Sequence, residues 1–402
     1  MTTTLTTSGR VRLTGRGRKR WLRGHPWIYA DDLSEVEAER GALVAVEDPH
    51  GTVVAYGAYS ADARLALRLF ARAADAPDDG DWRAHWRGVL TRALAVREAA
   101  GLADAAGAAR VLFGDSEGWP GLVVDRYADV LVLQCGTQFA DRTRDLALEL
   151  LDELLPHARV AVDRSDASVR RLEGLERRVE VVRGELPAEL IVREDALAYE
   201  VDVLGGHKTG HYLDQRANRV RFARRCAGRR VLDAFCYDGL FGVRAALAGA
   251  SEVVCVDQSA EALARLARNA ERNGVAGRVR GERADVMKDL RARHAAGERF
   301  GAISLDPPPF ARSRAEAAGA ERGYREVNSR ALRLLEPGGC LASASCSHAI
   351  RPEVWVEFLS QAARDAGRPV WLEELCGADV DHPVLLGLPE SAYLKCAFLR
   401  SA

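Results

Sequence analysis

Two residues in the C-terminal third of the chain could take part in catalysis. Cys346 lies between two serines, directly after the apolar segment Cys340–Ser345, which predicts a strand. A cysteine thiol is intrinsically nucleophilic and partly ionised near neutral pH, so it can attack an electron-poor carbon. Asp306 follows a second apolar segment, Phe300–Leu305, and three prolines come after it. Because proline cannot extend strand pairing, we expect the Asp306 carboxylate at the carboxyl edge of a sheet, where α/β folds bind ligands.

Both residues also have plain structural interpretations, a buried core thiol and a turn or helix-capping acid. His348 could form a Cys–His dyad with Cys346, but the sequence has no oxyanion-loop signature beside it. The cysteines are scattered and have no Cys-x-x-Cys spacing, so the sequence predicts neither a disulfide framework nor a metal site. They stand at positions 135, 226, 236, 255, 340, 346, 376 and 396.

Further strand-and-turn segments precede Asp306 at the spacing of a nucleotide-cofactor fold. The strand 231–234 breaks at a turn of mostly small residues, 235–239, before an alanine-rich helix, whose first backbone N–H groups can face a ligand. The next strand ends about twenty residues on at Asp257, the position at which a carboxylate meets ribose hydroxyls. Asp285 ends the following strand, where it could accept a hydrogen bond from the exocyclic amine of an adenine. The order and spacing of these segments indicate a nucleotide-cofactor fold.

The order of these segments resembles the class I S-adenosylmethionine-dependent methyltransferases. The Asp-Pro-Pro-x-Phe run at 306–310, followed by Ser-Cys-Ser, is similar to the RlmI-type 23S rRNA cytosine-C5 methyltransferases. Further matches lie at 207–216, 381–383 and 393–395, so the resemblance covers nearly the whole chain. It implies S-adenosyl-L-methionine as the cofactor, and 23S rRNA or a large-subunit assembly particle as the partner.

The resemblance also implies roles for individual residues. Cys346 would add to carbon 6 of the cytosine so that carbon 5 can attack the methyl group, while Asp306 holds the N3 or N4 edge of the ring. Pro307, Pro308 and Phe310 would contact the RNA base. The expected cofactor contacts are Gln215, Arg216, Asp233, Phe235, Tyr237, Gly239, Asp257, Asp285 and Asp306.

The chain departs from the family pattern at three places. Pro309 replaces a polar residue, and Asp238 stands where a threonine is usual, either to meet the methionine ammonium or to cap the helix. Related enzymes carry a second cysteine in the fourth strand segment that releases the product, and this chain has prolines there. The group that removes the carbon-5 proton therefore stays unassigned.

Basic residues gather in two stretches although the net charge is −1. Positions 10–23 hold seven arginines and lysines and no acid, with Trp21, Trp27 and Tyr29 close by. This composition suits contacts to RNA phosphates and bases, through Arg18, Lys19 and Arg20 in particular, or forms a solvated basic tail. A second set of seven arginines lies between 216 and 230, on the helix that leads into the cofactor strand.

We predict an α/β fold with three domains. Residues 9–75 show short alternating strands typical of a small β-barrel, and their place beside this catalytic domain resembles a PUA module, an RNA-binding fold. Residues 80–190 predict a middle α+β domain in the order strand-strand-helix-strand-strand. Residues 191–402 make the Rossmann-like methyltransferase domain.

No apolar run approaches the ~20 residues of a membrane span, and the polar N-terminus is unlike a secretory signal. We expect a cytoplasmic enzyme that uses neither a membrane nor a metal, and that could form oligomers. Two other functions stay open: methylation of another rRNA base atom, such as a guanine nitrogen, and a non-catalytic role as an RNA-binding assembly factor. Neither alternative needs the thiol of Cys346, so replacing this residue would distinguish both of them from cytosine-C5 methylation.

Overall fold

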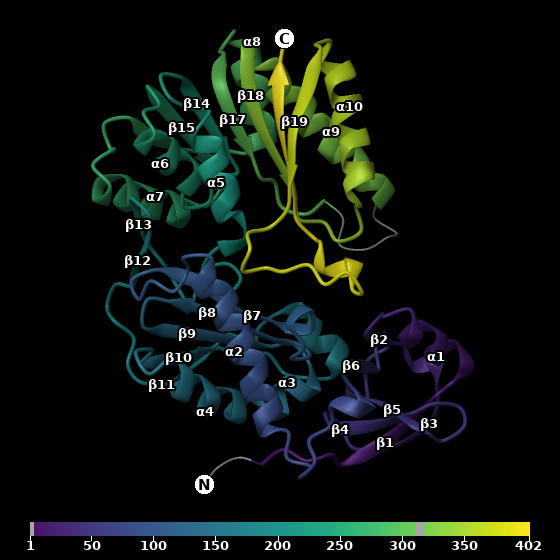
Figure 1. Ribbon diagram of the computed structural model, residues 1–402. Helices are drawn as coiled ribbons and strands as arrows, with labels where there is room; N and C mark the ends of the chain where they lie inside the picture. The colour runs from purple at the N-terminus through teal and green to yellow at the C-terminus, as the bar shows by residue number, and fades with distance from the viewer. Residues whose placement is uncertain (1–3, 311–316) are drawn as a thin grey trace. The chain divides into compact units, whose positions relative to one another are not determined.

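The computed structural model describes residues 4–310 and 317–402 and forms two compact units (Figure 1). Both units are discontinuous, because the chain returns from the second unit to the first at 201–213 and at 380–391. The first unit comprises Met1–Val192, Val201–Leu213 and Val380–Ser391; the second comprises Arg193–Glu200, Asp214–Asp379 and Ala392–Ala402.

The first unit begins with a six-stranded sheet in the order β2-β6-β5-β4-β1-β3. Its alternating strands bury an apolar core that includes Val11, Val44 and Leu67. Helix α1 (Gly15–Leu22) starts at Thr14, whose side chain caps it by accepting a hydrogen bond from the Gly17 backbone N–H. The strands are β1 (Gly9–Leu13), β2 (Trp27–Ile28), β3 (Leu33–Ala38), β4 (Leu43–Glu47), β5 (Val53–Tyr59) and β6 (Leu67–Arg72).

A second sheet of the same unit has five strands in the order β11-β10-β9-β8-β7. Helices α2 and α4 contact each other, and the core of this part includes the buried rings of Trp86, Trp119 and Phe139. The structure adds the strand β7 to the predicted order; this short apolar segment has no periodicity that separates it from a buried helix. The elements are α2 (Arg83–Ala99), β7 (Ala108–Phe113), β8 (Leu122–Tyr127), β9 (Val130–Cys135), α3 (Gln138–Arg142), α4 (Arg144–Leu154), β10 (Val160–Asp163) and β11 (Glu180–Arg183).

The second unit holds a seven-stranded sheet in the order β16-β15-β14-β17-β18-β20-β19. The first five strands in this order are parallel, and β20 runs antiparallel between β18 and β19. Helices α5, α6 and α7 lie on one face of the sheet and α8, α9 and α10 on the other (Figure 1). The strands are β14 (Arg230–Ala234), β15 (Glu252–Asp257), β16 (Val279–Arg283), β17 (Phe300–Leu305), β18 (Leu335–Ser345), β19 (Val370–Cys376) and β20 (Lys395–Ser401).

Helix α5 precedes β14, and α6 to α10 each follow a strand of the sheet. They are α5 (Arg216–Ala223), α6 (Leu240–Leu247), α7 (Ala260–Arg272), α8 (Val286–Ala295), α9 (Ala317–Arg333) and α10 (Pro352–Ala366). A separate hairpin of β12 (Ile191–Glu194) and β13 (Leu197–Glu200) precedes them. Within the described ranges, no helix is long and apolar enough to cross a membrane.

Candidate active site

The turn after β14 has an unusual backbone. Phe235, Tyr237 and Gly239 all adopt left-handed conformations, with φ of 60°, 51° and 77°. For the two aromatic residues this costs on the order of 1–3 kcal/mol each, and such strain gathers at functional sites. At Gly239 a side chain is excluded, because a Cβ would lie 2.0 Å from Leu266 Cδ1. The turn ends at the N-terminus of α6, where backbone N–H groups can face a ligand.

Asp233 is a buried carboxylate at the end of β14. Its Oδ1 accepts a hydrogen bond from Ser304 Oγ at 2.6 Å, and its Oδ2 accepts one from the Gly242 backbone N–H at 2.9 Å. Burial raises the pKa of Asp233 to about 7, the two hydrogen bonds act against this, and the nearby charges of Asp306 and Asp257 add to the rise. The sheet thus holds Asp233 rigidly against the first turn of α6.

Asp257 and Asp285 end the next two segments, as their spacing predicts. Asp257 Oδ2 accepts from the Tyr237 backbone N–H at 2.9 Å, so this carboxylate also stabilises the strained turn. Its Oδ1 accepts from the Ser259 backbone N–H at 2.9 Å. Asp285 is exposed and caps α8, accepting from the Lys288 backbone N–H at 3.0 Å. Each carboxylate oxygen has a second lone pair that can accept from a ligand.

Gln215 and Asp306 lie together. Gln215 Nε2 donates to Asp306 Oδ2 at 3.0 Å, and its Oε1 accepts from Asn218 Nδ2 at 2.8 Å. The neighbouring Arg216 has a different position, because its buried guanidinium donates to Asp379 Oδ2 at 3.0 Å. Gln215 therefore lies at the carboxylate that follows β17, and the Arg216 guanidinium lies at Asp379.

Cys346 lies at the end of β18, at the same edge of the sheet as Asp306, because β17 and β18 pair in parallel. Its side chain is half-buried, whereas Ser345 and Ser347 beside it are fully buried. The Tyr324 hydroxyl on α9 accepts from Ser345 Oγ at 3.0 Å and hydrogen-bonds Ser347 Oγ at 2.8 Å. These bonds anchor the backbone on both sides of the cysteine.

Aromatic packing continues from this anchor to the Asp-Pro-Pro-Pro-Phe segment. The ring of Phe310 packs edge-on against Tyr324, with centroids 4.8 Å apart. Pro307 is buried and Pro308 is exposed after the end of β17. Tyr324 therefore contacts Phe310 of one motif and the two serines that flank Cys346 in the other.

Lys395 is a residue of this site to which motif reasoning gave no role. It pairs with Ser345 in the β18–β20 register and is only 2% exposed. Its Nζ donates to the backbone carbonyls of Ser347 at 2.7 Å and Tyr393 at 2.8 Å, so both hydrogen-bond partners are neutral. Burial lowers the pKa of Lys395 to about 8, and the charge of Cys346 acts in the opposite direction. A lysine directly before the apolar run 396–399 was the signal that could have revealed it.

The basic residues predicted to contact RNA divide into two groups. Lys19 and Arg20 line a pocket of about 430 Å³ in the first unit, whereas Arg18 is absent from its lining and lies 3.5 Å from Asp48. The guanidinium of Arg20 also lies over the Tyr29 ring, 4.9 Å from its centroid. The described residues that line this pocket are Arg16, Lys19, Arg20, Arg23, His25, Leu386, Gly387 and Pro389.

Other arginines of the two basic stretches are bound to acids within the fold. Arg10 forms an ion pair with Glu37 at 2.7 Å. Arg219 is 2% exposed and its guanidinium lies 2.7 Å from the buried carboxylate of Glu194. Burying a charge is costly unless it is paired, and local sequence does not reveal which arginines have distant partners.

The carboxyl edge of the sheet fits a nucleoside cofactor. Gly242 cannot carry a side chain, because a Cβ would lie 2.5 Å from Cys255 Sγ, so α6 begins close against the sheet. The acids Asp233, Asp257 and Asp285 follow successive strands at this edge. Among the residues that the structure describes, no group of three or more metal-ligating side chains gathers.

Comparison with known proteins agrees with this geometry. A family model described as S-adenosylmethionine-dependent methyltransferase matches residues 168–385, and a PUA-like domain model matches residues 11–72. Ribosomal RNA large subunit methyltransferase I of Aeromonas hydrophila is 39% identical over 96% of this chain and 98% of its own length. The protein of the same name from Enterobacter sp. is 37% identical over 96% and 98%.

Solved structures share the fold. The crystal structure of SMU.776 complexed with SAH aligns with a TM-score of 0.83 at 18% identity, covering 97% of this chain and 99% of that one. Trm5b from Pyrococcus abyssi aligns with a TM-score of 0.53 at 16% identity, covering 69% and 74%. The chain therefore belongs to the S-adenosylmethionine-dependent methyltransferases, in the family of ribosomal RNA large subunit methyltransferase I.

Proposed function

We propose that this protein methylates carbon 5 of a cytosine in 23S rRNA, free or within a large-subunit particle, through a covalent adduct with Cys346. The observation that carries the proposal is the position of this thiol at the end of β18, at the sheet edge of Asp306 and beside the cation of Lys395. The names of the relatives support large-subunit rRNA as the substrate.

S-adenosylmethionine supplies an electrophilic methyl group when it is bound. Asp257 would accept from the ribose hydroxyls and Asp285 from the adenine amine. Asp233 and the turn from Phe235 to Gly239, with Tyr237, would line the methionine side, together with Gln215. Arg216, which is bound to Asp379, would support the start of α5 behind Gln215.

The cysteine makes a weak carbon nucleophile stronger. The Cys346 thiolate adds to carbon 6 of the ring, forming an S–C6 bond, and the electron pair of the C5–C6 double bond becomes available at carbon 5. Carbon 5 would then bond to the methyl group as the bond between that methyl group and the sulfonium sulfur breaks, so that S-adenosylhomocysteine is the leaving group. Loss of the carbon-5 proton to a base then restores the double bond as the S–C6 bond breaks, and Cys346 leaves as the thiolate.

The surrounding residues have supporting roles in this scheme. A target base in a folded RNA must leave its stack to reach such a pocket, where Pro307, Pro308 and Phe310 would contact it. Asp306 would hold the N3 or N4 edge of the ring and stabilise the protonated adduct. Lys395 would stabilise the Cys346 thiolate before addition and after release.

The test is a methylation assay with purified protein, methyl-labelled S-adenosylmethionine and unmodified 23S rRNA, with the labelled nucleoside identified by mass. We expect label in 5-methylcytidine, none with Cys346→Ala, and wild-type labelling with Cys376→Ala, a matched half-buried cysteine of the same unit. Binding of S-adenosylhomocysteine should be equal in all three proteins. Label in another nucleoside, or full activity of Cys346→Ala, would rule out the thiol mechanism.

A further inference from the structure

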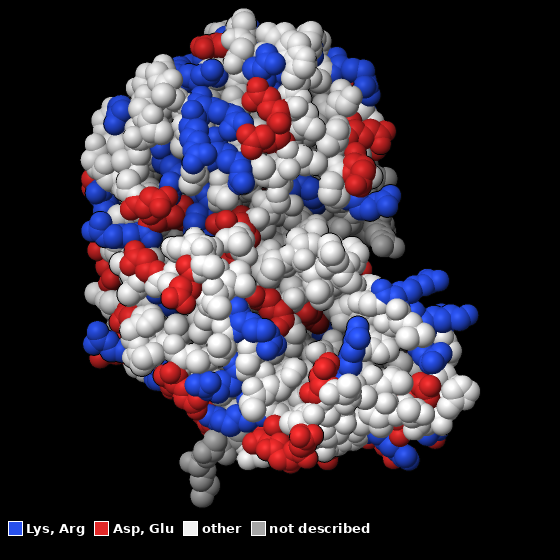
Figure 2. Space-filling model, in the orientation of Figure 1, with Lys and Arg blue, Asp and Glu red and all other residues white. Residues whose placement is uncertain are grey.

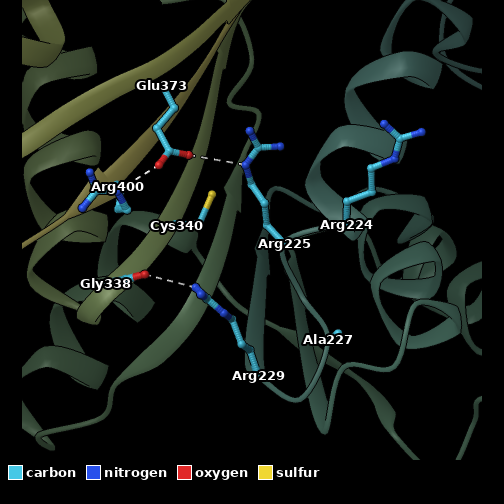
Figure 3. Close-up of a pocket in the computed structure, with 8 residues that line it drawn as sticks. All are labelled: Arg224, Arg225, Ala227, Arg229, Gly338, Cys340, Glu373 and Arg400. Carbon is cyan, nitrogen blue, oxygen red and sulfur yellow. Dashed lines mark hydrogen bonds and ion pairs between the residues drawn. The ribbon is translucent and has the colours of Figure 1, made fainter.

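A second pocket of the methyltransferase unit lies away from the candidate active site. It has a volume of about 350 Å³ (Figure 3). The lining comes from the end of α5, the turn before β14, and three neighbouring strands: Arg224, Arg225, Ala227, Arg229, Gly338, Cys340, Glu373 and Arg400.

The pocket lies at the opposite edge of the parallel sheet from the cofactor acids. Arg229 directly precedes β14, and Cys340 pairs with Arg400 near the far end of β20. Cys346 follows Cys340 along β18 and its end, a distance of about 20 Å at the usual rise of a strand. The pocket is thus separate from the site of methyl transfer.

The lining carries a surplus of positive charge, with four arginines and one glutamate. The glutamate, Glu373, is shared between two of them: its carboxylate lies 2.9 Å from Arg400 Nε and 3.6 Å from Arg225 Nε. Figure 3 shows this carboxylate between the two guanidinium groups. A second acid, Glu374, also forms an ion pair with Arg225.

The other two arginines have no carboxylate partner among the described residues. Arg229 donates to the carbonyls of Gly301 at 2.8 Å and Gly338 at 3.2 Å, which orient its guanidinium without neutralising it. Arg224 is exposed at the C-terminal end of α5. Figure 2 shows Lys and Arg side chains gathered over this part of the unit, with acidic side chains beside them.

The chemistry of the lining favours a phosphate group over a base. Guanidinium groups bind phosphate oxygens in a bidentate manner. Among the residues that the structure describes, no aromatic side chain lines the pocket. The guanidinium groups of Arg225 and Arg400 lie over the rings of Phe398 and Trp371, 4.7 and 4.6 Å from the centroids. Contacts of this kind position a nucleic acid without reading its sequence.

We propose that this pocket is a second RNA-contact site, which binds a backbone phosphate of the RNA whose base is modified at the opposite edge of the sheet. The inference rests on the proposed function only in that the substrate is an RNA. Two contacts about 20 Å apart would fix the direction in which the RNA crosses the methyltransferase unit.

The test is the salt dependence of RNA binding, measured by fluorescence anisotropy with a labelled 23S rRNA fragment and with a mixed-sequence RNA of equal length. Arg224→Ala removes one phosphate contact, so the slope of the logarithm of the RNA-binding constant against the logarithm of salt concentration, which is negative, should become shallower by about 1. This corresponds to about fivefold weaker binding at 0.15 M salt, equally for both RNAs. Arg224→Glu should weaken binding further.

Arg291→Ala is the matched control, since Arg291 is an exposed arginine on α8 of the same unit. Its slope should equal that of the wild type, and S-adenosylhomocysteine affinity should be unchanged in every variant. Equal slopes for Arg224→Ala and the control would overturn the proposal. Titration with inorganic pyrophosphate separates RNA from a free anion: saturable binding that Arg224→Ala abolishes, without loss of RNA affinity, would assign the pocket to a small anion instead.

Binding and methyl transfer are measured separately, so the two proposals can fail independently. If the salt dependence of RNA binding becomes weaker in Arg224→Ala while the product is a nucleoside other than 5-methylcytidine, the proposed phosphate site is supported and the thiol mechanism is ruled out. If 5-methylcytidine forms and the slope is unchanged, the chemistry stands and the pocket does not.

Discussion

Replacement of Lys395 by methionine tests how the fold prepares Cys346 for reaction. The buried ammonium group donates to the carbonyls of Ser347 and Tyr393, and burial lowers the pKa of Lys395 to about 8. The charge of Cys346 raises the pKa of Lys395. Because this interaction is mutual, the lysine must lower the pKa of the Cys346 thiol.

The size of the effect follows from Coulomb's law. An opposite charge within about 4–6 Å shifts a pKa by about one to three units, because two unit charges at such separations attract by about 3–4 kcal/mol at an effective dielectric constant of about 20. The variant should therefore raise the pKa of Cys346 by about one to two units. Tyr324, which hydrogen-bonds both flanking serines, and His348, stacked on Tyr393, remain in the variant and contribute equally to both proteins. The lysine loses its charge above about pH 8, so the difference should be greatest below that pH.

The assay is the rate of iodoacetamide alkylation of Cys346, followed by peptide mass spectrometry from pH 6 to 10 without RNA or cofactor. In Lys395→Met the rate at pH 7 should fall about tenfold or more, whereas Lys395→Arg should stay near the wild type because it keeps a cation. Cys376 in the same digest is the internal reference, and thermal unfolding checks the fold. Identical pH profiles for Lys395→Met and wild type would refute the reasoning.

Three further predictions concern stability and cofactor binding. The pKa of Asp233 is raised to about 7, so the protonated carboxyl stabilises the fold below about pH 4, and this contribution is lost as the pH rises through 7. Between these values the free energy of unfolding should fall by up to about 1.4 kcal/mol per pH unit, and urea unfolding of Asp233→Asn should show a smaller dependence on pH. Gly239→Ala should cost about 2 kcal/mol or more in thermal unfolding and weaken S-adenosylhomocysteine binding, because its Cβ would meet Leu266. Arg68→Met leaves the buried carboxylate of Glu173 without its partner at 3.0 Å and should cost about 3–5 kcal/mol, with Glu173→Gln in the same chain restoring part of it.

The sequence predicted where the candidate site residues lie along the strands of the sheet. Asp257 ends β15, and Asp306 and Cys346 directly follow β17 and β18, as apolar runs, prolines and small residues indicate. The roles of these residues, and the domain boundaries at 9–75, 80–190 and 191–402, stay predictions. The missed strand β7 shows the limit of this reasoning, since a short apolar segment has no period of its own.

The sequence by itself determined the fold class, the family and the order of chemical groups at the strand ends, because these depend on local patterns a few residues long. Only the tertiary structure decided which of the many arginines are neutralised and which are open. Arg219 forms an ion pair with Glu194, and Arg216 donates a hydrogen bond to Asp379, which lies 163 positions away in the chain. It also placed Lys395 beside Cys346, since β20 inserts between β18 and β19. Burial and charge at these residues arise from the order of strands in the sheet, which the spacing of residues in the chain does not record.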